Sequence, residues 1–353
     1  MLARCGNAVV MAAGAAIRTL KSGLLSAAGE GLFTHMDLVS TPKNPIPLGA
    51  SSGYLDIRKG VRVRYASWQS ALRERHGTVC IFPGRNEFIE KYFEVVGELR
   101  RRGFAVAVLD WRGQGGSSRL TRGQMKGHVR DFADYEEDLN HFMKGVVLPD
   151  CPMPYYALAH SMAATVLFNT ATKRGCWFSR MVMTAPMVRL VGLPMSQGLC
   201  ARLTDGLTLF GFGRQAVPGK PEQWTGDVFE GNPLTSDRER FYRNAAVLEA
   251  APGLAVGPPT IGWLNAAFEA MARLKDEKYA PRIRVPSLLV SAGDDHIVSS
   301  KAIEDLASRL RAGSQLVLRG SRHEILQERD SIREQFWAAF DAFIPGVKLS
   351  KAS

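Results

Sequence analysis

Short apolar runs alternate with longer segments of helical periodicity from residue 54 onward, and this alternation limits the possible folds more than any other feature. Alternating strands and helices form right-handed βαβ units around a mostly parallel sheet. Strands that are apolar throughout, such as residues 78–82, fit a sheet that is covered on both faces. Residues 61–68 alternate polar and apolar side chains instead, as in an edge strand. Further strands are expected at residues 105–109, 155–159, 181–184, 285–291 and 315–318, and helices at 88–102, 131–147, 163–173, 301–310 and 331–343.

Residues 188–281 interrupt this pattern, because they contain no clear strand. An insertion after the carboxyl end of a strand lies above the crevice in which open α/β sheets bind ligands. We therefore predict a helical cap here, inserted before the strand at 285–291. The predicted organisation is an N-terminal extension (1–35), the first part of an α/β core (36–187), the cap (188–281), the second part of the core (282–346) and a tail (347–353).

The first residues of the chain have an unusual composition. Residues 1–29 contain basic residues and no acidic one, and they are rich in Ala and Gly. This composition fits a disordered or targeting extension, an amphipathic surface segment, or a start codon placed too far upstream. The segment is left out of the fold prediction.

A serine follows the predicted strand at 155–159 and precedes a predicted helix. The segment is Ala159-His160-Ser161-Met162-Ala163. A nucleophilic serine on a sharp strand-to-helix turn needs small residues on both sides, because strand and helix approach closely there. The two alanines meet that need. The alternative is a helix N-cap, a position that also favours serine.

A serine nucleophile needs a histidine as its base and a carboxylate that orients the histidine. The strand at 285–291 runs into two carboxylates, of which we favour Asp295 and assign Asp294 to the turn. His323 follows the last predicted strand and is the histidine best placed for the base. His160 adjoins Ser161, and we expect it to point away from the serine.

Acyl transfer develops negative charge on the former carbonyl oxygen, and two backbone amides commonly bind it. The amide of Met162 directly follows the candidate nucleophile. The loop after the strand at 78–82 contains Gly84, which permits a turn that aims the next amide, of Arg85, into the pocket. The alternative is an ordinary Pro-Gly turn.

Together these motifs resemble the α/β-hydrolases, in particular the branch of bacterial lysophospholipases and monoacylglycerol lipases. The resemblance runs from about residue 38 to residue 343. It includes the loops at 82–85, 110–117, 159–163, 292–295 and 320–323, and the stretch Asn-Pro-Leu-Thr-Ser-Asp at 232–237 of the cap. This chain departs from the family pattern at Pro83, where relatives carry histidine, and at Ala159 and Ala163, where relatives carry glycine.

The resemblance implies an α/β-hydrolase fold with a catalytic triad of Ser161, Asp295 and His323. It also implies that Asp110 is structural. The expected activity is hydrolysis of lipid esters, most of all lysophospholipids or monoacylglycerols, through an acyl-enzyme on Ser161 and without a metal or organic cofactor. A general carboxylesterase or peptidase of the same fold and a non-catalytic binding protein stay as alternatives.

The formal net charge of +11 is spread over scattered basic residues that form no nucleic-acid-binding motif. We therefore expect no nucleic-acid partner, but attraction to anionic membrane stays open. The chain has five cysteines, an odd number without a Cys-x-x-Cys pair, which indicates a reducing compartment. We predict a cytoplasmic location, with peripheral contact to a membrane as an open alternative.

Overall fold

The structure, a computed structural model, describes residues 38–73, 75–121, 125–173, 176–217 and 228–345. The predicted N-terminal extension and the predicted tail lie outside the described residues. The described core begins at Leu38 and contains the sheet, its flanking helices and the helices of the predicted cap.

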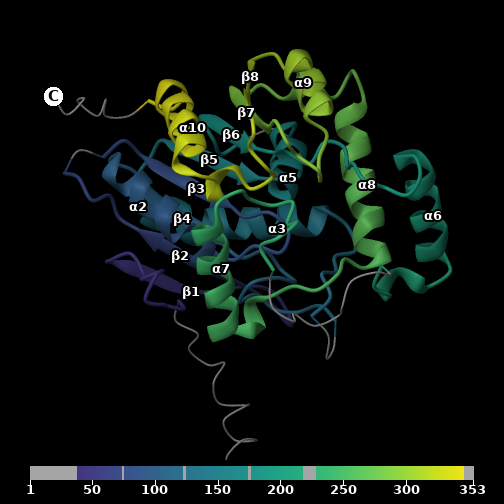
Figure 1. Ribbon diagram of the computed structural model, residues 1–353, viewed down its shortest axis with the longest axis horizontal. Helices are drawn as coiled ribbons and strands as arrows, with labels where there is room; N and C mark the ends of the chain where they lie inside the picture. Colours follow the sequence, from purple (N-terminus) through teal and green to yellow (C-terminus); the bar gives the residue numbers. More distant parts are fainter. Residues whose placement is uncertain (1–37, 74, 122–124, 174–175, 218–227, 346–353) are drawn as a thin grey trace, which may run out of the picture. The chain divides into compact units, whose positions relative to one another are not determined.

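An eight-stranded sheet forms the centre of the core, with the strand order β1-β2-β4-β3-β5-β6-β7-β8 (Figure 1). Strand β2 runs antiparallel to β1 and β4, and every other neighbouring pair is parallel. The prediction of a mostly parallel α/β sheet is therefore confirmed. The strands are β1 (Ala50–Arg58), β2 (Val61–Trp68), β3 (Thr78–Phe82), β4 (Ala105–Leu109), β5 (Tyr155–His160), β6 (Arg180–Thr184), β7 (Ser287–Ala292) and β8 (Gly313–Leu318).

Strand β2 is not an edge strand, so that prediction is wrong. Strand β1 pairs with β2 from Ala50 opposite Trp68 to Arg58 opposite Val61, with a register shift between Asp56 and Arg58. The sequence did not predict this strand, because it begins Ala-Ser-Ser-Gly and has mostly exposed side chains. Backbone pairing with β2 holds it in place without an apolar run of its own.

The register of the parallel strands aligns their carboxyl ends. Phe82 at the end of β3 pairs with Ala159 near the end of β5, and Ala292 of β7 pairs with Leu318 of β8. The loops that follow β3, β5, β7 and β8 therefore leave the same edge of the sheet. Candidate site residues that are far apart in the sequence meet at this edge.

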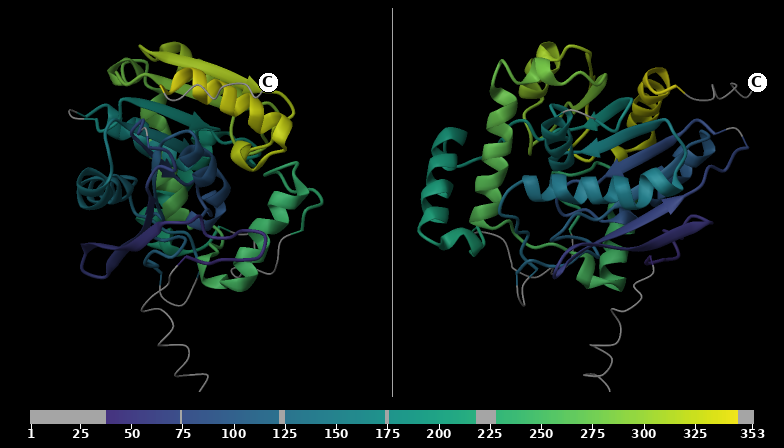
Figure 2. Two further views of the ribbon diagram at one scale, coloured as in Figure 1. Left: turned by 90° about the vertical axis from the view of Figure 1, so that its left-hand side faces the viewer. Right: turned by 180° about the vertical axis from the view of Figure 1, so that it is seen from behind.

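Helices cover both faces of the sheet (Figures 1 and 2). Helices α2 (Phe93–Arg101) and α10 (Asp330–Phe343) lie on one face, joined by the ion pairs Arg102–Asp341 and Arg333–Glu98. The other face carries α3 (Ala133–Phe142), α5 (Met162–Ala171) and α9 (Ser300–Arg309). Helix α3 runs on through a π-helical turn, η2 (Met143–Val147), into α4 (Leu148–Asp150).

The helix predicted at 88–102 begins instead as a 3₁₀ turn, η1 (Ile89–Tyr92), that leads into α2. The backbone amide of Ile89 donates to Oδ1 of Asp110 at 2.9 Å. This bond directs the first turn toward the loop after β4.

Three longer helices lie between β6 and β7, and no sheet strand occurs in the described part of this stretch. They are α6 (Gln197–Leu209), α7 (Arg238–Ala250) and α8 (Ile261–Lys275), with the short turns η3 (Phe212–Arg214), η4 (Pro252–Leu254) and η5 (Ala280–Arg282). Each longer helix begins at a side-chain cap, on Ser196, Asp237 and Thr260 respectively. Helix α8 packs against α5, α6 packs outside α8, and α7 lies apart from both (Figures 1 and 2). We call residues 188–281 the cap.

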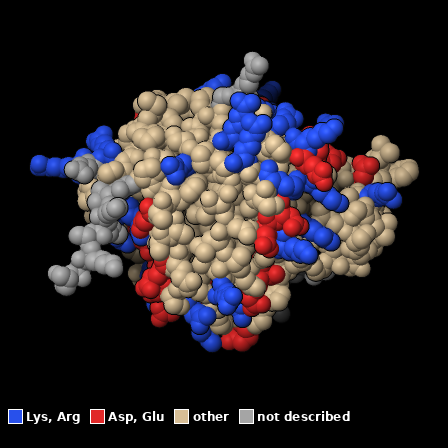
Figure 3. Space-filling view, turned by 90° about the horizontal axis from the view of Figure 1, so that it is seen from above, with Lys and Arg blue, Asp and Glu red and all other residues tan. Residues whose placement is uncertain are grey.

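Charged side chains of both signs are interspersed on the face shown in Figure 3, around a wide uncharged area. Within the described ranges, no helix is both long and apolar enough to cross a membrane.

Candidate active site

Ser161 lies on the turn between β5 and α5, with backbone angles φ 51° and ψ −115°. A positive φ is strained for a residue with a side chain and costs about 1–3 kcal/mol. Ala159 and Ala163 on either side are completely buried, as close packing of strand and helix requires. Ser161 takes the N-cap position of α5, yet its side chain makes no capping hydrogen bond among the described residues. The geometry thus speaks against a simple N-cap serine.

The side chain of Ser161 contacts a histidine from the other end of the core. Nε2 of His323, in the loop after β8, lies 3.0 Å from Oγ of Ser161. Nδ1 of the same ring lies 2.8 Å from Oδ2 of Asp295, in the loop after β7. A carboxylate can only accept, so Nδ1 carries the proton and Nε2 is free to accept from the hydroxyl. The structure thus brings together the three residues that the sequence singled out.

Asp295 is fixed by further hydrogen bonds. Its Oδ1 accepts from the backbone amides of Ile297 at 2.8 Å and Val298 at 2.9 Å. Burial alone would raise the pKa of Asp295, but these bonds and the one from His323 hold that pKa below its ordinary value. Asp294, the alternative acid, is exposed and pairs with the exposed His296 at 3.3 Å. Of the two carboxylates, Asp295 is the one that reaches His323.

The loop after β3 lies against Ser161. A methyl group built on Gly84 would come within 3.3 Å of Cβ of Ser161 and 2.8 Å of Cδ2 of His160. The loop is held by Gln114, which donates to the carbonyl of Gly84 at 2.7 Å, and by Trp111, which donates to that of Pro83 at 2.8 Å.

Arg85 and Met162 both line the cavity at Ser161. The side chain of Arg85 turns toward the cap, where it donates to the carbonyl of Gly257 and lies 5.3 Å from the ring of Trp263. Burial lowers the pKa of this guanidinium to about 10. The oxyanion role of the two amides stays a prediction.

Asp110 lies in a buried ionic cluster away from the serine. Its Oδ2 accepts from Nε of Arg64 at 2.7 Å and from the amide of Gly116 at 2.7 Å. Both Nη atoms of Arg64 donate to Glu90 at 2.8 Å. Burial raises the pKa of Asp110 and so favours its neutral form. The positive charge of Arg64 acts in the opposite direction and lowers this pKa. These contacts tie η1 and the loop after β4 to β2.

A cavity of about 420 Å³ opens at Ser161 and His323. Most of its wall is apolar, and the cap supplies a large share of it. The apolar lining residues are Phe88, Met162, Met187, Leu190, Pro233, Leu234, Phe241, Leu248, Trp263 and Ile297. An apolar cavity with a few convergent polar groups is typical of a small-molecule site.

The sequence analysis missed a buried ionic cluster in this wall. Nζ of Lys91 contacts Glu324 and lies 3.1 Å from Oε1 of Glu87, and Tyr92 donates to Glu87 at 2.6 Å. Burial alone would raise the pKa of Glu87, but Lys91, Tyr92 and the amide of Gly84 lower it to about 2. Burial opposes a charged Lys91, yet both carboxylates raise its pKa. The i,i+4 spacing of Glu87 and Lys91 was the only sequence signal.

His160 does not point away from the site as expected. Its ring lines the cavity, and the ring centroid lies 4.8 Å from that of His323. Its Nδ1 is 3.1 Å from the carbonyl oxygen of Thr184. Burial lowers the pKa of His160 to about 4 and keeps the ring neutral, despite the nearby Glu87.

The sheet order and the strained serine at the end of β5 define an α/β-hydrolase. Residues 73–330 match the family described as "Serine aminopeptidase, S33", and the chain belongs to this family. Together with the lysophospholipase and monoacylglycerol lipase relatives described next, this membership makes the chain an ester hydrolase of the α/β-hydrolase fold.

Relatives among characterised proteins include lysophospholipase L2 of Escherichia coli, which is 31% identical over 287 residues, 77% of this chain and 81% of that protein. Monoacylglycerol lipase of Mycolicibacterium smegmatis is 31% identical over 130 residues, 36% of this chain and 44% of the lipase.

Solved structures share the fold at low sequence identity. A soluble variant of the monoglyceride lipase from Saccharomyces cerevisiae, in complex with a substrate analogue, has a TM-score of 0.65 and 18% identity, covering 84% of this chain and 96% of that one. A thermostable carboxyl esterase from Bacillus coagulans, in complex with glycerol, has a TM-score of 0.66 and 17% identity, covering 84% and 100%.

Proposed function

We propose that the chain hydrolyses carboxylic esters of lipids, lysophospholipids or monoacylglycerols, through an acyl-enzyme on Ser161. One observation carries this proposal: the hydrogen-bonded chain from Ser161 through His323 to Asp295 opens into a largely apolar cavity. A nucleophile, its base and the group that orients the base are thus within reach of one another and of a space that suits an acyl chain.

In the first step, Nε2 of His323 takes the proton of Ser161 while Oγ attacks the ester carbonyl carbon. The amides of Arg85 and Met162 bind the oxyanion of the tetrahedral intermediate. As the intermediate collapses, the proton passes from His323 to the leaving alcohol, and the acyl group stays on Ser161.

In the second step, water gives its proton to Nε2 of His323 and attacks the acyl carbon. The fatty acid leaves, and the proton returns to Oγ of Ser161. Asp295 orients the ring and stabilises its charged form in both steps. No metal or organic cofactor enters this sequence.

Two features support a lipid as the substrate. The cavity wall is mostly apolar, and the chain is 31% identical to a lysophospholipase.

The peptidase alternative has a specific observation of its own. Two carboxylates, Glu87 and Glu324, line the cavity and could face the α-amino group of a peptide. Both are already paired with Lys91, which weakens this alternative.

Contact with a lipid surface is part of the proposal. The outer side of the cap exposes large apolar side chains on and beside α6, which belong to Leu199, Leu203, Leu209, Phe210 and Phe212. An exposed apolar patch of this kind marks an interaction site. Helix α6 packs on α8, and Trp263 of α8 lines the cavity. The patch is therefore connected to the wall of the cavity through α8.

We place the protein in the cytoplasm, with peripheral membrane contact. Cys80, Cys151, Cys176 and Cys200 are free thiols, which suits a reducing compartment.

A fluorophosphonate probe tests the nucleophile. Wild type should be labelled and Ser161→Ala should not, whereas equal labelling of both would refute the assignment. A panel of lysophosphatidylcholine, monoacylglycerol, a short p-nitrophenyl ester and an amino-acid arylamide then identifies the substrate class. Preference for the short ester or the arylamide over both lipids would contradict the lipid proposal.

A further inference from the structure

The loop that carries His323 is bound on both sides of the histidine by one segment of the cap. We call residues 319–329 the histidine loop and residues 232–237, just before α7, the docking segment. The backbone amide of Glu324 donates to the carbonyl of Leu234 at 2.8 Å. The guanidinium of Arg322 donates to the carbonyls of Asn232 at 2.9 Å and Thr235 at 3.0 Å. Both chain neighbours of the candidate base therefore contact the cap.

The carboxylate of Glu328 joins the docking segment to the histidine loop. The residue is completely buried. Its Oε1 accepts from the backbone amides of Arg322 at 2.8 Å and Ser236 at 3.1 Å. Its Oε2 accepts from the hydroxyl of Ser236 and from the backbone amide of Arg329 at 3.2 Å. Four donors thus converge on one carboxylate, which fixes the residue before His323 relative to the cap.

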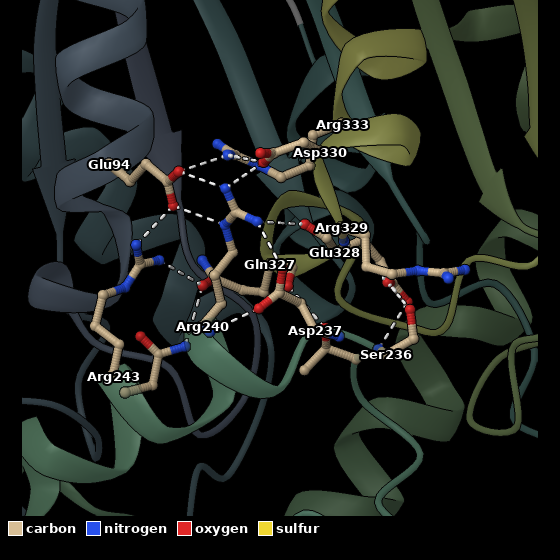
Figure 4. A network of polar contacts seen from close by, with 12 residues as sticks. Glu94, Ser236, Asp237, Arg240, Arg243, Gln327, Glu328, Arg329, Asp330 and Arg333 are labelled. Atoms are coloured by element: carbon tan, nitrogen blue, oxygen red, sulfur yellow. Dashed lines mark hydrogen bonds and ion pairs between the residues drawn. The ribbon is translucent and has the colours of Figure 1, made fainter.

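Figure 4 shows how helix α7 is held around this contact. Glu94 of α2 accepts from Arg240 and Arg243 of α7 and from Arg333 of α10. Arg240 also donates to the carbonyl of Glu328 at 3.1 Å. The α7 part of the cap is therefore anchored to the core by ion pairs around the docking segment.

Gln327 adds four further links. Its Oε1 accepts from Asn244 at 3.1 Å and Arg243 at 3.2 Å, both in α7, and its carbonyl accepts from Thr235 at 2.7 Å. Its Nε2 donates to the carbonyl of Lys91 in η1 at 3.0 Å. The histidine loop is thus connected to the cap and to the element that follows the candidate oxyanion loop.

We propose that Glu328 and Ser236 are positioning residues that hold His323 in its reactive place through the backbone of the histidine loop. This inference rests on the proposed function, because it takes His323 as the base. Neither residue touches the reacting atoms. Proton transfer needs the ring at hydrogen-bond distance from Ser161, and a misplacement of about 1 Å costs about 100-fold in rate.

The variants Glu328→Gln and Ser236→Ala test this inference. A carboxamide has one acceptor oxygen for four donors, and its own NH₂ group would face some of them. We expect kcat on a short ester to fall about 10-fold or more in E328Q, and less in S236A, with KM changed less than about twofold. Fluorophosphonate labelling should slow in parallel. A change that destabilises only the transition state lowers kcat and leaves KM nearly unchanged, whereas a deformed cavity would raise KM.

Glu94→Gln is the matched control. It makes the same carboxylate-to-amide change within the network of Figure 4, but Glu94 does not bond to the histidine loop. E94Q should lower the melting temperature and leave kcat unchanged. If E94Q lowers kcat as much as E328Q does, or if E328Q and S236A keep wild-type kcat, the inference is wrong. S236A keeps the test available if E328Q fails to fold, because it removes only one of the four donors.

The NMR signal of one proton distinguishes a failure of this inference from a failure of the proposed function. The low-field signal of the Nδ1 proton between His323 and Asp295 should be sharp in wild type and E94Q and broadened in E328Q. If wild type hydrolyses no ester, the proposed function fails, while the resonance still reports whether Glu328 holds the ring. An unchanged resonance in E328Q would overturn the positioning role alone.

Discussion

Oδ2 of Asp295 accepts from Nδ1 of His323 at 2.8 Å, while its other oxygen is occupied by the backbone amides of Ile297 and Val298. This division of the two oxygens determines what an amide would do at this position. In the variant Asp295→Asn, the carbonyl oxygen of the new side chain would stay on the two backbone amides, so its NH₂ group would face His323. Nδ1 would then have to accept, and the proton would move to Nε2.

We therefore expect Asp295→Asn to lower kcat by about 10³–10⁴, because Nε2 could no longer accept the proton of Ser161. Kinetics with a short ester measure the effect. Asp294→Asn is the control at the neighbouring exposed carboxylate, and it should keep wild-type kcat. A larger loss in D294N than in D295N would transfer the acid role to Asp294.

Gly84→Ala is expected to damage the oxyanion loop. The added methyl group would meet Cδ2 of His160 at 2.8 Å and Cβ of Ser161 at 3.3 Å, so the loop must move away from the nucleophile. Loss of one oxyanion donor costs about 10²–10³ in kcat. Gly198→Ala is a control in α6, where a methyl group meets nothing within 4 Å. Normal kcat and normal labelling of G84A would show that the amide of Arg85 is not needed.

His160 should make the stability of the fold depend on pH. In the unfolded chain its pKa has the ordinary value of 6.5. In the folded chain the pKa is about 4, mainly because burial disfavours the charged ring. Protonation therefore favours the unfolded state. The contribution is fully present above pH 6.5 and is lost as the pH falls toward 4, on the order of 3 kcal/mol in all.

Urea unfolding of wild type and His160→Gln at pH 7, 5.5 and 4.5 checks this expectation. Glutamine does not titrate, while the other ionisable groups are the same in both proteins. The difference in unfolding free energy between the two should shrink or reverse as the pH falls. Parallel pH curves would mean that folding does not lower the pKa of His160.

Much of the site geometry follows from the order of elements along the chain. Ser161, Asp295 and His323 each come after a predicted strand, and parallel strands end at one edge of the sheet, so their meeting could be predicted without coordinates. Their chemical roles stay predictions. The fold class was predictable for the same reason, because strand and helix periods differ.

Other features depend on contacts that no local pattern encodes. Lys91 and Glu324 are 233 positions apart, and Ser236 and Glu328 are 92 apart. Charged residues ordinarily indicate exposed positions, so their burial in pairs was invisible in the sequence. Strand β1 was missed because backbone pairing, not an apolar run, holds it in the sheet.

The exposed apolar patch on the cap should bind lipid surfaces. Leu203 is 51% exposed and Phe210 is 79% exposed, and neither lines the cavity. Burying one such side chain fully in an apolar phase contributes about 1.5–3 kcal/mol. A lipid surface would bury each of these two side chains in part, so replacing both should weaken vesicle binding by about 10-fold or more.

Sedimentation with vesicles of phosphatidylcholine and phosphatidylglycerol measures this for the double variant Leu203→Ser, Phe210→Ser. Met153→Ser is the matched control, since Met153 is 74% exposed but precedes β5, at the sheet edge opposite Ser161. Hydrolysis of a short soluble ester should stay normal in both variants, and equal vesicle binding by the double variant and wild type would exclude α6 as the lipid-contacting surface.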